Sequence, residues 1–360
     1  MLVKLKDIAT FINGRAYLMP EIQKTGKYRI VRVGNFSGKD EWFYSDMELE
    51  PDKYCTKGDL LYKWACNFGP EIWKEEKVIY HYHIWKIIVD ETKANKLYLY
   101  YLLKVMTPYW LSSTNGSTMV HITKEIMEDK LIELPSLKSQ NKIASILSSI
   151  DAQIERNNAM VKKLQVLAHT TFDYFSKNNT KSNFVVLNDI LVEKDKSKIQ
   201  VSDVQDVSGF IPFFTSGETV LYTNKKLETG FNIFLSTGGN AKVQAYYGDV
   251  AYSTDTWCIT AKNNLQFYLF EYLKHIESQM DKLYFHGTGL KHLQKPIFLK
   301  SIITIPNEEL LMKYNTIVEP IYQRISSIEQ STIQLQYLKN KLLPLLINQQ
   351  LVWKKPYLKI

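Results

Sequence analysis

Two sets of side chains in the first half of the chain could bind a metal ion. Pro51-Asp52 followed by Glu75-Glu76-Lys77 loosely matches the two acids and a lysine that some nucleases place around a metal. The second set has residue types that ligate zinc, namely Cys55, Cys66, His81 and His83. Its members lack the short, paired spacing of ordinary zinc sites. Both patterns are weak, and we expect neither a catalytic centre nor a bound metal.

Motifs of other enzymes that act on nucleic acids or nucleotides are not found in the sequence. It has no Asn/Asp-Pro-Pro-aromatic motif of an amino-methyltransferase and no Gly-x4-Gly-Lys-Ser/Thr phosphate loop. Gly287-x-Gly289 is too short for a dinucleotide fingerprint. The candidate chemistry therefore favours a binding protein over an enzyme, and a standalone nuclease is the weakest of the alternatives.

The composition is that of a globular protein with a modest positive charge. The 360 residues are 45% hydrophobic and 23% charged, which excludes wholesale disorder. No apolar run approaches 18 residues, and the first seven residues are not those of a secretory signal, so we expect no membrane association. Three scattered cysteines favour a reducing, cytoplasmic setting. The net charge of +8 is shared equally by the two halves of the chain and suits a nucleic-acid partner.

The chain contains an internal repeat. Gly116–His121 aligns with Gly287–His292 at an offset of 171 residues, and the same offset continues without a gap for about fifty residues. Pro135 then matches Pro306, and further apolar residues match beyond them. The segments nearest the start of each half match only in their framework. We therefore expect two related domains that share a scaffold and differ in their loops.

A heptad stripe of apolar residues predicts a long helix in each half. The first stripe runs through residues 139–175 without Pro or Gly, with Ser139 as the expected N-cap. Its 37 residues would form a rod of about 55 Å. The second runs from about Glu308 to Leu346, and Pro320 should kink it or delay its regular part. A heptad stripe cannot bury itself alone, so we expect the two helices to pack antiparallel, with packing of each helix on its own domain alone as the alternative.

The fold class that follows is α+β, with two pseudo-repeated, strand-rich domains and two long antiparallel coiled-coil helices. The predicted boundaries are 1–135 and 179–306 for the domains, 136–178 and 307–348 for the helices, and 349–360 for a tail. Within the domains, 58–62, 78–89, 232–236, 245–252 and 256–260 are predicted as strands, and 97–105 and 267–276 as short helices.

This arrangement resembles the specificity (S) subunit of type I restriction–modification systems. The stretch from Pro135 to Ile154 is similar to that family's central conserved segment, and the stretch from Leu335 to Gln349 is similar to its C-terminal one. Ser236-Thr-Gly-Gly239 and Ala251-Tyr-Ser-Thr-Asp255 are similar to strings common in its second recognition domains. The resemblance covers essentially the whole chain, and the repeat with both helices is more specific than any single motif.

The resemblance implies a non-catalytic subunit that recognises a bipartite site in double-stranded DNA. Each domain would read one half-site, and the helices would set the spacer between them. The helices would also dock methyltransferase subunits, two of them by the internal symmetry, and restriction subunits would join through these. The chain itself would bind no cofactor, because S-adenosylmethionine is expected on the partner methyltransferase subunit. Two alternatives remain open: a coiled-coil scaffold without DNA specificity, and a specificity subunit of another phage-defence system.

Loops that vary on a shared scaffold are the places to look for base readers. Residues 63–69 in the first domain, and their predicted counterpart 237–242 in the second, have side chains able to pair with base edges. The matched Gly116–His121 and Gly287–His292 loops are candidates for phosphate contact. The second domain has no arginine from Ser176 to Gln323, so it must read with other residue types. The DNA-binding candidates are Arg15, Arg32, Lys63, Asn67, His121, Thr237, Asn240, Lys242, Gln244, Lys291 and His292.

Basic side chains on the outer faces of the helices are the candidates for docking partner subunits. They are Lys138, Lys142, Arg156 and Lys162 on the first helix, and Arg324, Lys339 and Lys341 on the second. A solvated, charged helix face would carry the same residues.

Overall fold

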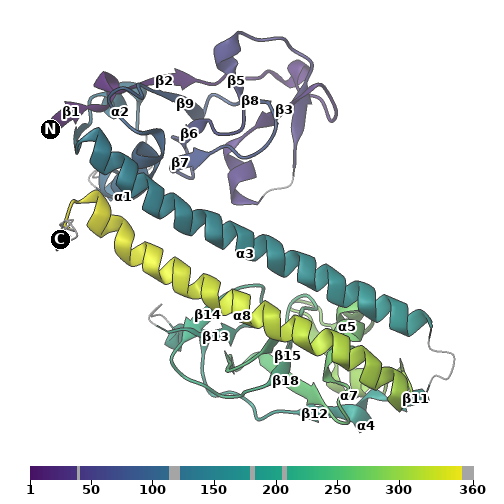
Figure 1. Ribbon diagram of the computed structural model, residues 1–360. Coiled ribbons are helices and arrows are strands. Elements are labelled where there is room, and N and C mark those ends of the chain that lie inside the picture. Colours follow the sequence, from purple (N-terminus) through teal and green to yellow (C-terminus); the bar gives the residue numbers. More distant parts are fainter. Residues whose placement is uncertain (39–40, 113–121, 179–182, 205–208, 351–360) are drawn as a thin grey trace, which may run out of the picture. The chain divides into compact units, whose positions relative to one another are not determined.

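A computed structural model describes residues 1–38, 41–112, 122–178, 183–204 and 209–350 of the chain (Figure 1). The chain forms two compact units. The first holds Met1–Ala152 with the chain from Leu338 onward, and the second holds Gln153–Tyr337. Each unit therefore contains one half of the repeat and part of both long helices. No helix in the described ranges is both long enough and apolar enough to cross a bilayer.

The first unit is built around two four-stranded sheets. One is fully antiparallel and has the order β2-β9-β6-β7. Its strands are β2 (Ala9–Asn13), β9 (Ile84–Val89), β6 (Leu60–Lys63) and β7 (Gly69–Ile72). The other has the order β4-β3-β8-β5, with β3 and β8 parallel. Its strands are β4 (Phe43–Ser45), β3 (Tyr28–Val31), β8 (Val78–Tyr80) and β5 (Tyr54–Cys55).

Aromatic residues on alternate strand positions fill the space between the first sheet and its helices. The rings of Tyr62 and Trp85 stack at 5.7 Å, and Phe11 meets Trp85 edge-on at 5.8 Å. The unit is completed by β1 (Leu2–Lys4) paired with β10 (Leu131–Glu133), and by helices α1 (Lys96–Ser112) and α2 (Lys124–Glu128).

The second unit repeats this topology. Its antiparallel sheet has the order β12-β18-β15-β16. Its second sheet has three strands in the order β14-β13-β17, in which β13 and β17 are parallel, as β3 and β8 are in the first unit. These strands are β12 (Leu191–Glu193), β18 (Thr256–Ala261), β15 (Phe231–Ser236), β16 (Val243–Tyr247), β14 (Val220–Thr223), β13 (Ile211–Phe214) and β17 (Ala251–Tyr252). The remaining elements are β11 (Asn183–Val186) with β21 (Ile302–Ile305), β19 (Phe285–His286) with β20 (His292–Leu293), α4 (Leu187–Ile190), α5 (Gln266–His275), α6 (Glu277–Leu283) and α7 (Lys295–Leu299).

The matching strand orders confirm the repeat. The strand pair β6–β7 of the first unit corresponds to β15–β16 of the second, so the loops that join these pairs are equivalent. The predicted equivalence of loops 63–69 and 237–242, which we call the reading loops, is therefore confirmed.

The two predicted long helices are α3 (Leu137–Lys177) and α8 (Glu308–Ile347). Their 41 and 40 residues correspond to about 60 Å each. In the second unit, Asn157 Nδ2 donates to Thr332 Oγ1 over 3.0 Å, and the ring of Phe175 meets that of Tyr314 at 5.7 Å. Residue numbers rise along α3 as they fall along α8, which confirms the antiparallel pairing.

Both long helices also close the core of each unit. In the first unit, Ile143, Leu147 and Leu346 are buried in the same cluster as the sheet. In the second unit, the corresponding cluster contains Phe172 of α3 and Val318 of α8. The helices therefore pack on each other and on the domains, so the alternative of packing on the domains alone is wrong.

Two predicted strands are each divided between two sheets. The run 78–89 breaks at His81–His83, where a turn carries the chain from β8 into β9 of the other sheet. The run 245–252 breaks at Gly248, whose φ of +144° favours glycine and turns the chain from β16 towards β17. The first break carries neither Gly nor Pro, so the sequence pattern did not mark it.

Two details of the long helices also differ from expectation. Ser136, not Ser139, caps α3, because its Oγ accepts a hydrogen bond from the Ser139 amide over 3.3 Å. Helix α8 is continuous from Glu308 to Ile347 and contains Pro320 in its interior. The expectation that Pro320 delays the start of the regular helix is therefore wrong.

Candidate nucleic-acid interface

The loop between β6 and β7 of the first unit packs on the turn between β8 and β9. Trp64 Nε1 donates to the carbonyl of Tyr82 over 2.8 Å, and its ring lies 5.1 Å from that of His83. Tyr82 in turn contacts both His81 and His83 through its ring. We call these four residues, Trp64, His81, Tyr82 and His83, the ring cluster. Tyr82 is the most exposed residue of the ring cluster, at 38% exposed.

The ring cluster is partly exposed at the surface of the first unit, and two of its four rings are imidazoles. Burial, with help from His83 and Arg32, lowers the pKa of His81 to about 4. A neutral imidazole offers one donor and one acceptor to a base edge, rather than a charge to a phosphate. The sequence pattern suggested only a zinc-ligand role for His81 and His83 and did not reveal this grouping.

Arg32 and Asn67 lie beside the ring cluster and are exposed. The Arg32 guanidinium lies 4.9 Å from the centre of the Phe43 ring, which orients it through a cation–π contact. Asn67 Nδ2 donates to Ser37 Oγ over 2.9 Å, so the reading loop is tied to the short helix that follows Arg32. The structure thus brings two of the first domain's predicted base readers to one place.

The other two predicted readers of the first domain are held by acids of the same domain. Arg15 forms a bidentate pair with Glu21, at 2.7 and 2.9 Å, and this hydrogen bonding lowers the pKa of the Glu21 carboxyl. Lys63 was expected in an exposed loop, but it ends strand β6 and is only 4% exposed. Its ammonium group binds Glu71 at 3.0 Å and lies over the Phe36 ring. Both cations serve the fold in this arrangement.

In the second unit, two loops about fifty residues apart come together. The amide of Gly239 donates to the carbonyl of Lys291 over 2.9 Å, and the amide of Leu293 donates to the carbonyl of Thr237 over 3.0 Å. Gly238 and His292 also form an isolated β-bridge. The reading loop 237–242 is therefore continuous with the Gly287–His292 loop, and the second domain's candidates gather on one surface.

The side chains on this surface are exposed or only weakly held. Asn240 and His292 are exposed, while Thr237 Oγ1 donates to the carbonyl of Asp255. Lys242 and Lys291 pair with Glu218 and Asp281, each over 2.9 Å. Glu218 is 85% exposed, and exposed ion pairs are weak, so a phosphate can replace this acid at Lys242. Their acids have lowered pKa values because of the lysine hydrogen bonds.

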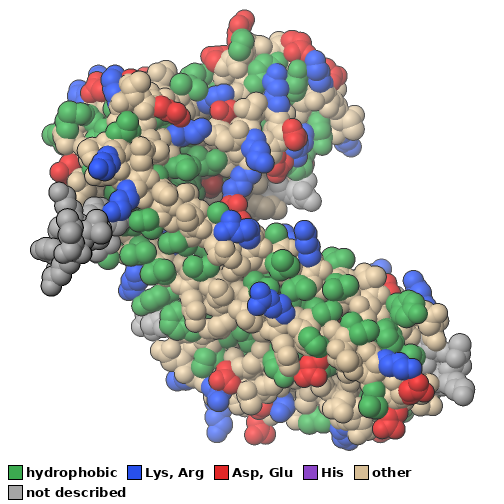
Figure 2. Space-filling model, viewed as in Figure 1, with side chains coloured by type: hydrophobic (Ala, Val, Ile, Leu, Met, Phe, Trp, Pro, Cys, Tyr) green, Lys and Arg blue, Asp and Glu red, His purple; other side chains and the backbone are tan. Residues whose placement is uncertain are grey.

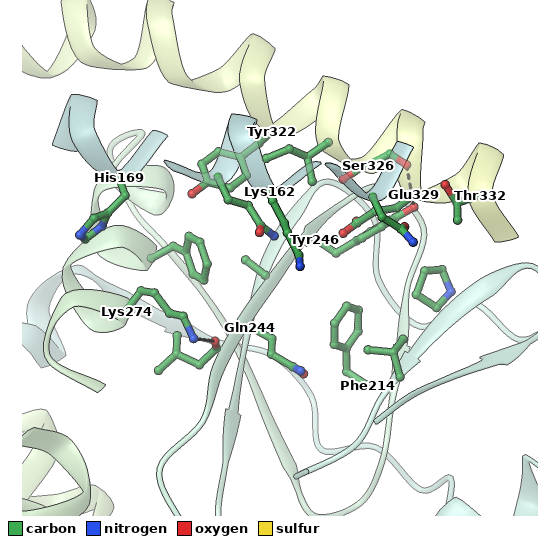
Figure 3. Close-up of a pocket in the computed structure, with 18 of the residues that line it drawn as sticks. Lys162, His169, Phe214, Gln244, Tyr246, Lys274, Tyr322, Ser326, Glu329 and Thr332 are labelled. Carbon is green, nitrogen blue, oxygen red and sulfur yellow. Dashed lines mark hydrogen bonds between the residues drawn. The ribbon is translucent and has the colours of Figure 1, made fainter. Parts of the chain in front are cut away.

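A cavity of about 880 Å³ lies beside this surface, within the second unit (Figure 3). Lys162 of α3 and Lys274 of α5 line it, as do Lys242 and Gln244. Gln244 Nε2 donates weakly to the carbonyl of Glu218 at 3.5 Å. The opposite wall comes from α8 and includes Glu329, whose pKa burial raises to about 7.

The first domain's candidate His121, with the Gly116–His121 loop, lies outside the described residues.

Most of the predicted docking residues are exposed on the long helices. The exposed ones are Lys138, Lys142, Arg156, Lys162, Arg324 and Lys341. Lys339 is an exception, because it pairs with Asp151 and is 16% exposed. On the face drawn in Figure 2, Lys and Arg side chains are interspersed with Asp and Glu rather than gathered in one patch.

Exposed apolar residues on α3 form a stripe that sequence reasoning missed. Met160, Leu167 and Tyr174 repeat every seven residues and are 49%, 50% and 64% exposed. The signal was present as a second heptad register beside the buried one. A line of exposed apolar side chains on a helix is typical of a protein–protein contact surface.

The weak nuclease and zinc patterns do not form sites in the structure. Glu75 is paired with Arg29 over 2.7 Å, and Asp52 with Lys53 over 3.3 Å. Cys55 is buried, which raises the pKa of its thiol to about 12, while Cys66 is exposed. Within the described ranges, neither pattern brings three metal-ligating side chains together.

Known proteins are similar to this chain in sequence and fold. The chain is 26% identical over 169 residues to the EcoBI type I restriction enzyme specificity subunit of Escherichia coli. It is 24% identical over 292 residues to the MjaIX specificity subunit of Methanocaldococcus jannaschii. These matches cover 45% and 69% of this chain, and 34% and 68% of the relatives. The chain thus spans about a third of the first relative's length and two thirds of the second's.

A solved structure supports the fold over nearly the whole chain. The S subunit of a type I restriction–modification system from M. genitalium superposes with a TM-score of 0.65, covering 96% of this chain and 95% of that one, at 15% identity. The family model described as the type I restriction modification DNA specificity domain matches residues 1–165 and again 179–337. Two copies of one family domain, with matching strand orders and a long helix after each, therefore place this chain in the family of type I restriction–modification DNA specificity proteins.

Proposed function

We propose that this chain is the non-catalytic DNA-recognition subunit of a type I restriction–modification complex. Each domain reads one half of a bipartite site in double-stranded DNA. The observation that carries the proposal is the pair of equivalent loops, 63–69 and 237–242, which occupy the same place in one scaffold and carry different side chains. Two readers of different chemistry fit two different half-sites.

The ring cluster and Arg32 would read the first half-site. The second half-site would be read by Asn240, Lys242 and Gln244, with Lys291 and His292 at the adjacent phosphates. Arginine or lysine pairs with guanine, and asparagine or glutamine with adenine, in the major groove. The positive charge of the chain supports this proposal, because binding to phosphates releases counterions and depends on salt.

The long helices would dock two methyltransferase subunits, which carry S-adenosylmethionine, and restriction subunits would join through them in the cytoplasm. The stripe of Met160, Leu167 and Tyr174 is the surface that supports docking on α3, with Arg156 beside it. An apolar centre with a charged rim is the usual composition of such interfaces. The chain would then need no catalytic residues of its own.

Modified-base sequencing of the host genome, with and without the gene, tests the recognition function directly. We expect methylation at one split motif, two short blocks around a fixed gap, to disappear when the gene is deleted. Unchanged methylation, with the partner methyltransferase expressed and active, would contradict the proposal and favour a scaffold without DNA specificity.

The role of the helices as a ruler has a separate test. Inserting one helical turn of about four residues after the exposed Ala159, with a matched insertion in α8, should lengthen the gap of the methylated motif while leaving both half-sites intact. The same gap in the lengthened protein would show that the helices do not set the spacer.

A further inference from the structure

Three potential metal ligands meet where α3 packs on α5 in the second unit. His169 and Asp173 are one helical turn apart on α3, and His275 ends α5. His169 Nε2 lies 4.0 Å from Asp173 Oδ1, and His275 Nδ1 lies 3.9 Å from the same oxygen. The ligand atoms of these three side chains all lie within 4.8 Å of one another.

A buried carboxylate orients the first of these histidines. Glu271 is 3% exposed, and its Oε2 accepts a hydrogen bond from His169 Nδ1 over 3.0 Å. The hydroxyl of Tyr322 donates to the other oxygen of Glu271, which fixes the carboxylate in turn. With Nδ1 occupied, His169 presents Nε2 towards Asp173. A carboxylate behind a ligating histidine is the usual outer partner in metal sites, where it sets the tautomer and raises the basicity of the ligand.

We propose that His169, Asp173 and His275 bind a divalent transition-metal cation, with Zn²⁺ preferred. Two imidazoles and one carboxylate suit Zn²⁺ rather than Mg²⁺ or Ca²⁺, which take mainly oxygen ligands. Three protein ligands leave the fourth tetrahedral position for water. The site is independent of DNA recognition and differs from the expectation that the chain holds no metal.

The ligands need only small movements to reach coordination geometry. Ligand atoms around tetrahedral Zn²⁺ lie about 3.4 Å apart, so the three side chains must close by roughly 1 Å. Their side chains are 43%, 37% and 53% exposed for His169, Asp173 and His275, so solvent surrounds them and rotation about their side-chain bonds is open. The two histidine rings already lie nearly parallel, with centres 5.9 Å apart.

Metal binding would clasp the second domain to the long helix. Helix α5 continues into α6, where Glu277 accepts a hydrogen bond from the Val243 amide and Asp281 from the Ala241 amide. A metal ion at this site would therefore hold in place the helices that support loop 237–242. The role of that loop in reading DNA rests on the proposed function, whereas the metal site does not. At the repeat offset of 171 residues, α8 carries Asn340 and Pro344, so the equivalent positions in the first unit lack the pair of helix ligands.

Zn²⁺ binding to the full-length chain tests the proposal. The chain is stripped with EDTA, and Zn²⁺ binding is measured by titration calorimetry, with Co²⁺ absorption reporting tetrahedral nitrogen and oxygen ligation. We expect one tight site in the wild type, lost in Asp173→Asn and in His275→Gln. Glu271→Gln should weaken binding by about 10–100-fold, because it removes the charge of the outer carboxylate but keeps a hydrogen-bonding side chain. His286→Gln is the matched control, because His286 is exposed and lies outside the cluster.

The outcomes separate a metal site from a hydrogen-bonded cluster of polar side chains. Equal Zn²⁺ affinity in the wild type, Asp173→Asn and His275→Gln would overturn the proposal, as would the absence of a tight site in the wild type. Thermal unfolding provides a second measurement: saturating Zn²⁺ should raise the Tm of the wild type and of His286→Gln, but not that of the two ligand variants. Both measurements use isolated protein, so they stand whatever methylome sequencing shows.

Discussion

The two halves of the chain share a scaffold but present different chemistry at its equivalent loops. In the first half, the loop after β6 leads with Trp64 into the ring cluster, next to Arg32. In the second, the loop after β15 carries small polar residues and Lys242, which pairs with the exposed Glu218, and no arginine lies between Ser176 and Gln323. The strand orders match, so the difference lies in side chains that the fold does not need. Under the proposed function, this separation would let one scaffold, used twice, present different side chains to two half-sites.

The polar contacts between α3 and α8 also differ between the two units. In the first unit, a charged network joins the helices, with Asp151 bound by Lys339 and by the hydroxyl of Tyr101. In the second, the helices meet through the neutral pair of Asn157 and Thr332. One helix pair thus uses two kinds of polar contact along its length. The predictions below test whether the units also behave as separate structures.

The largest expected effect comes from truncating a buried side chain through which α3 packs on a domain, in one unit at a time. Phe172→Ala, at a side chain 3% exposed in the second core, should lower the free energy of unfolding by about 3–5 kcal/mol. Leu147→Ala, fully buried in the first core, should lower it by about 2–5 kcal/mol. Hydrogen exchange should show the loss of protection mainly in the unit that carries the change. Equal loss across both units in each variant would show one cooperative structure instead.

A smaller effect should depend on pH and belong to the second unit. Burial raises the pKa of Glu329 from 4.5 to about 7 in the folded chain. The folded state then holds the proton more tightly than the unfolded state, so this contribution to stability is complete below pH 4.5 and is lost as the pH rises through 7. Glu329→Gln removes the titration, and the variant should exceed the wild type by roughly 1–3 kcal/mol at pH 8.

Urea unfolding between pH 5 and pH 8 measures this difference. The repeat supplies a comparison, because the residue 171 positions earlier is the neutral Asn158. We expect the two curves to converge towards pH 5. A constant gap between wild type and Glu329→Gln at every pH would mean that packing, rather than ionisation, sets the stability at this position.

The comparison of readers is tested by Arg32→Ala, which should affect one half-site alone. Loss of a bidentate pair with guanine reduces discrimination by about 1–3 kcal/mol. Binding of the assembled complex to DNA variants of each half-site measures the change. Arg29→Ala is the matched control, because Arg29 lies in β3 three residues before Arg32 and is held by Glu75 and the Trp42 ring. A uniform loss over all DNA sequences would make Arg32 a phosphate contact.

The sequence was informative where periodicity or repetition carries the information. The heptad stripe predicted α3 and α8 to within two residues at most ends, because a long apolar period has one simple explanation. The repeat predicted which loops are equivalent. Individual side-chain contacts could not be predicted: nothing in the sequence pattern around Lys63 shows that Glu71, on the neighbouring strand, pairs with it. The same limit hid the ring cluster, since its members come from two loops that meet only after folding.

The smallest expected effect distinguishes the two polar contacts between the helices. Asp151→Asn keeps the size of the side chain but removes the ionic partner of Lys339, and should lower the free energy of unfolding by about 1 kcal/mol at low salt. Part of that difference should vanish near 1 M salt, because salt screens a partly buried pair less than an exposed one but does not leave it unchanged. Asn157→Ala removes a neutral hydrogen bond and should also lower it by about 1 kcal/mol, but equally at both salt concentrations, because Thr332 still donates to the Ile328 carbonyl. Urea unfolding at 0.05 M and 1 M salt compares the two variants. A matching salt response in both would remove the distinction between a charged contact in one unit and a neutral contact in the other.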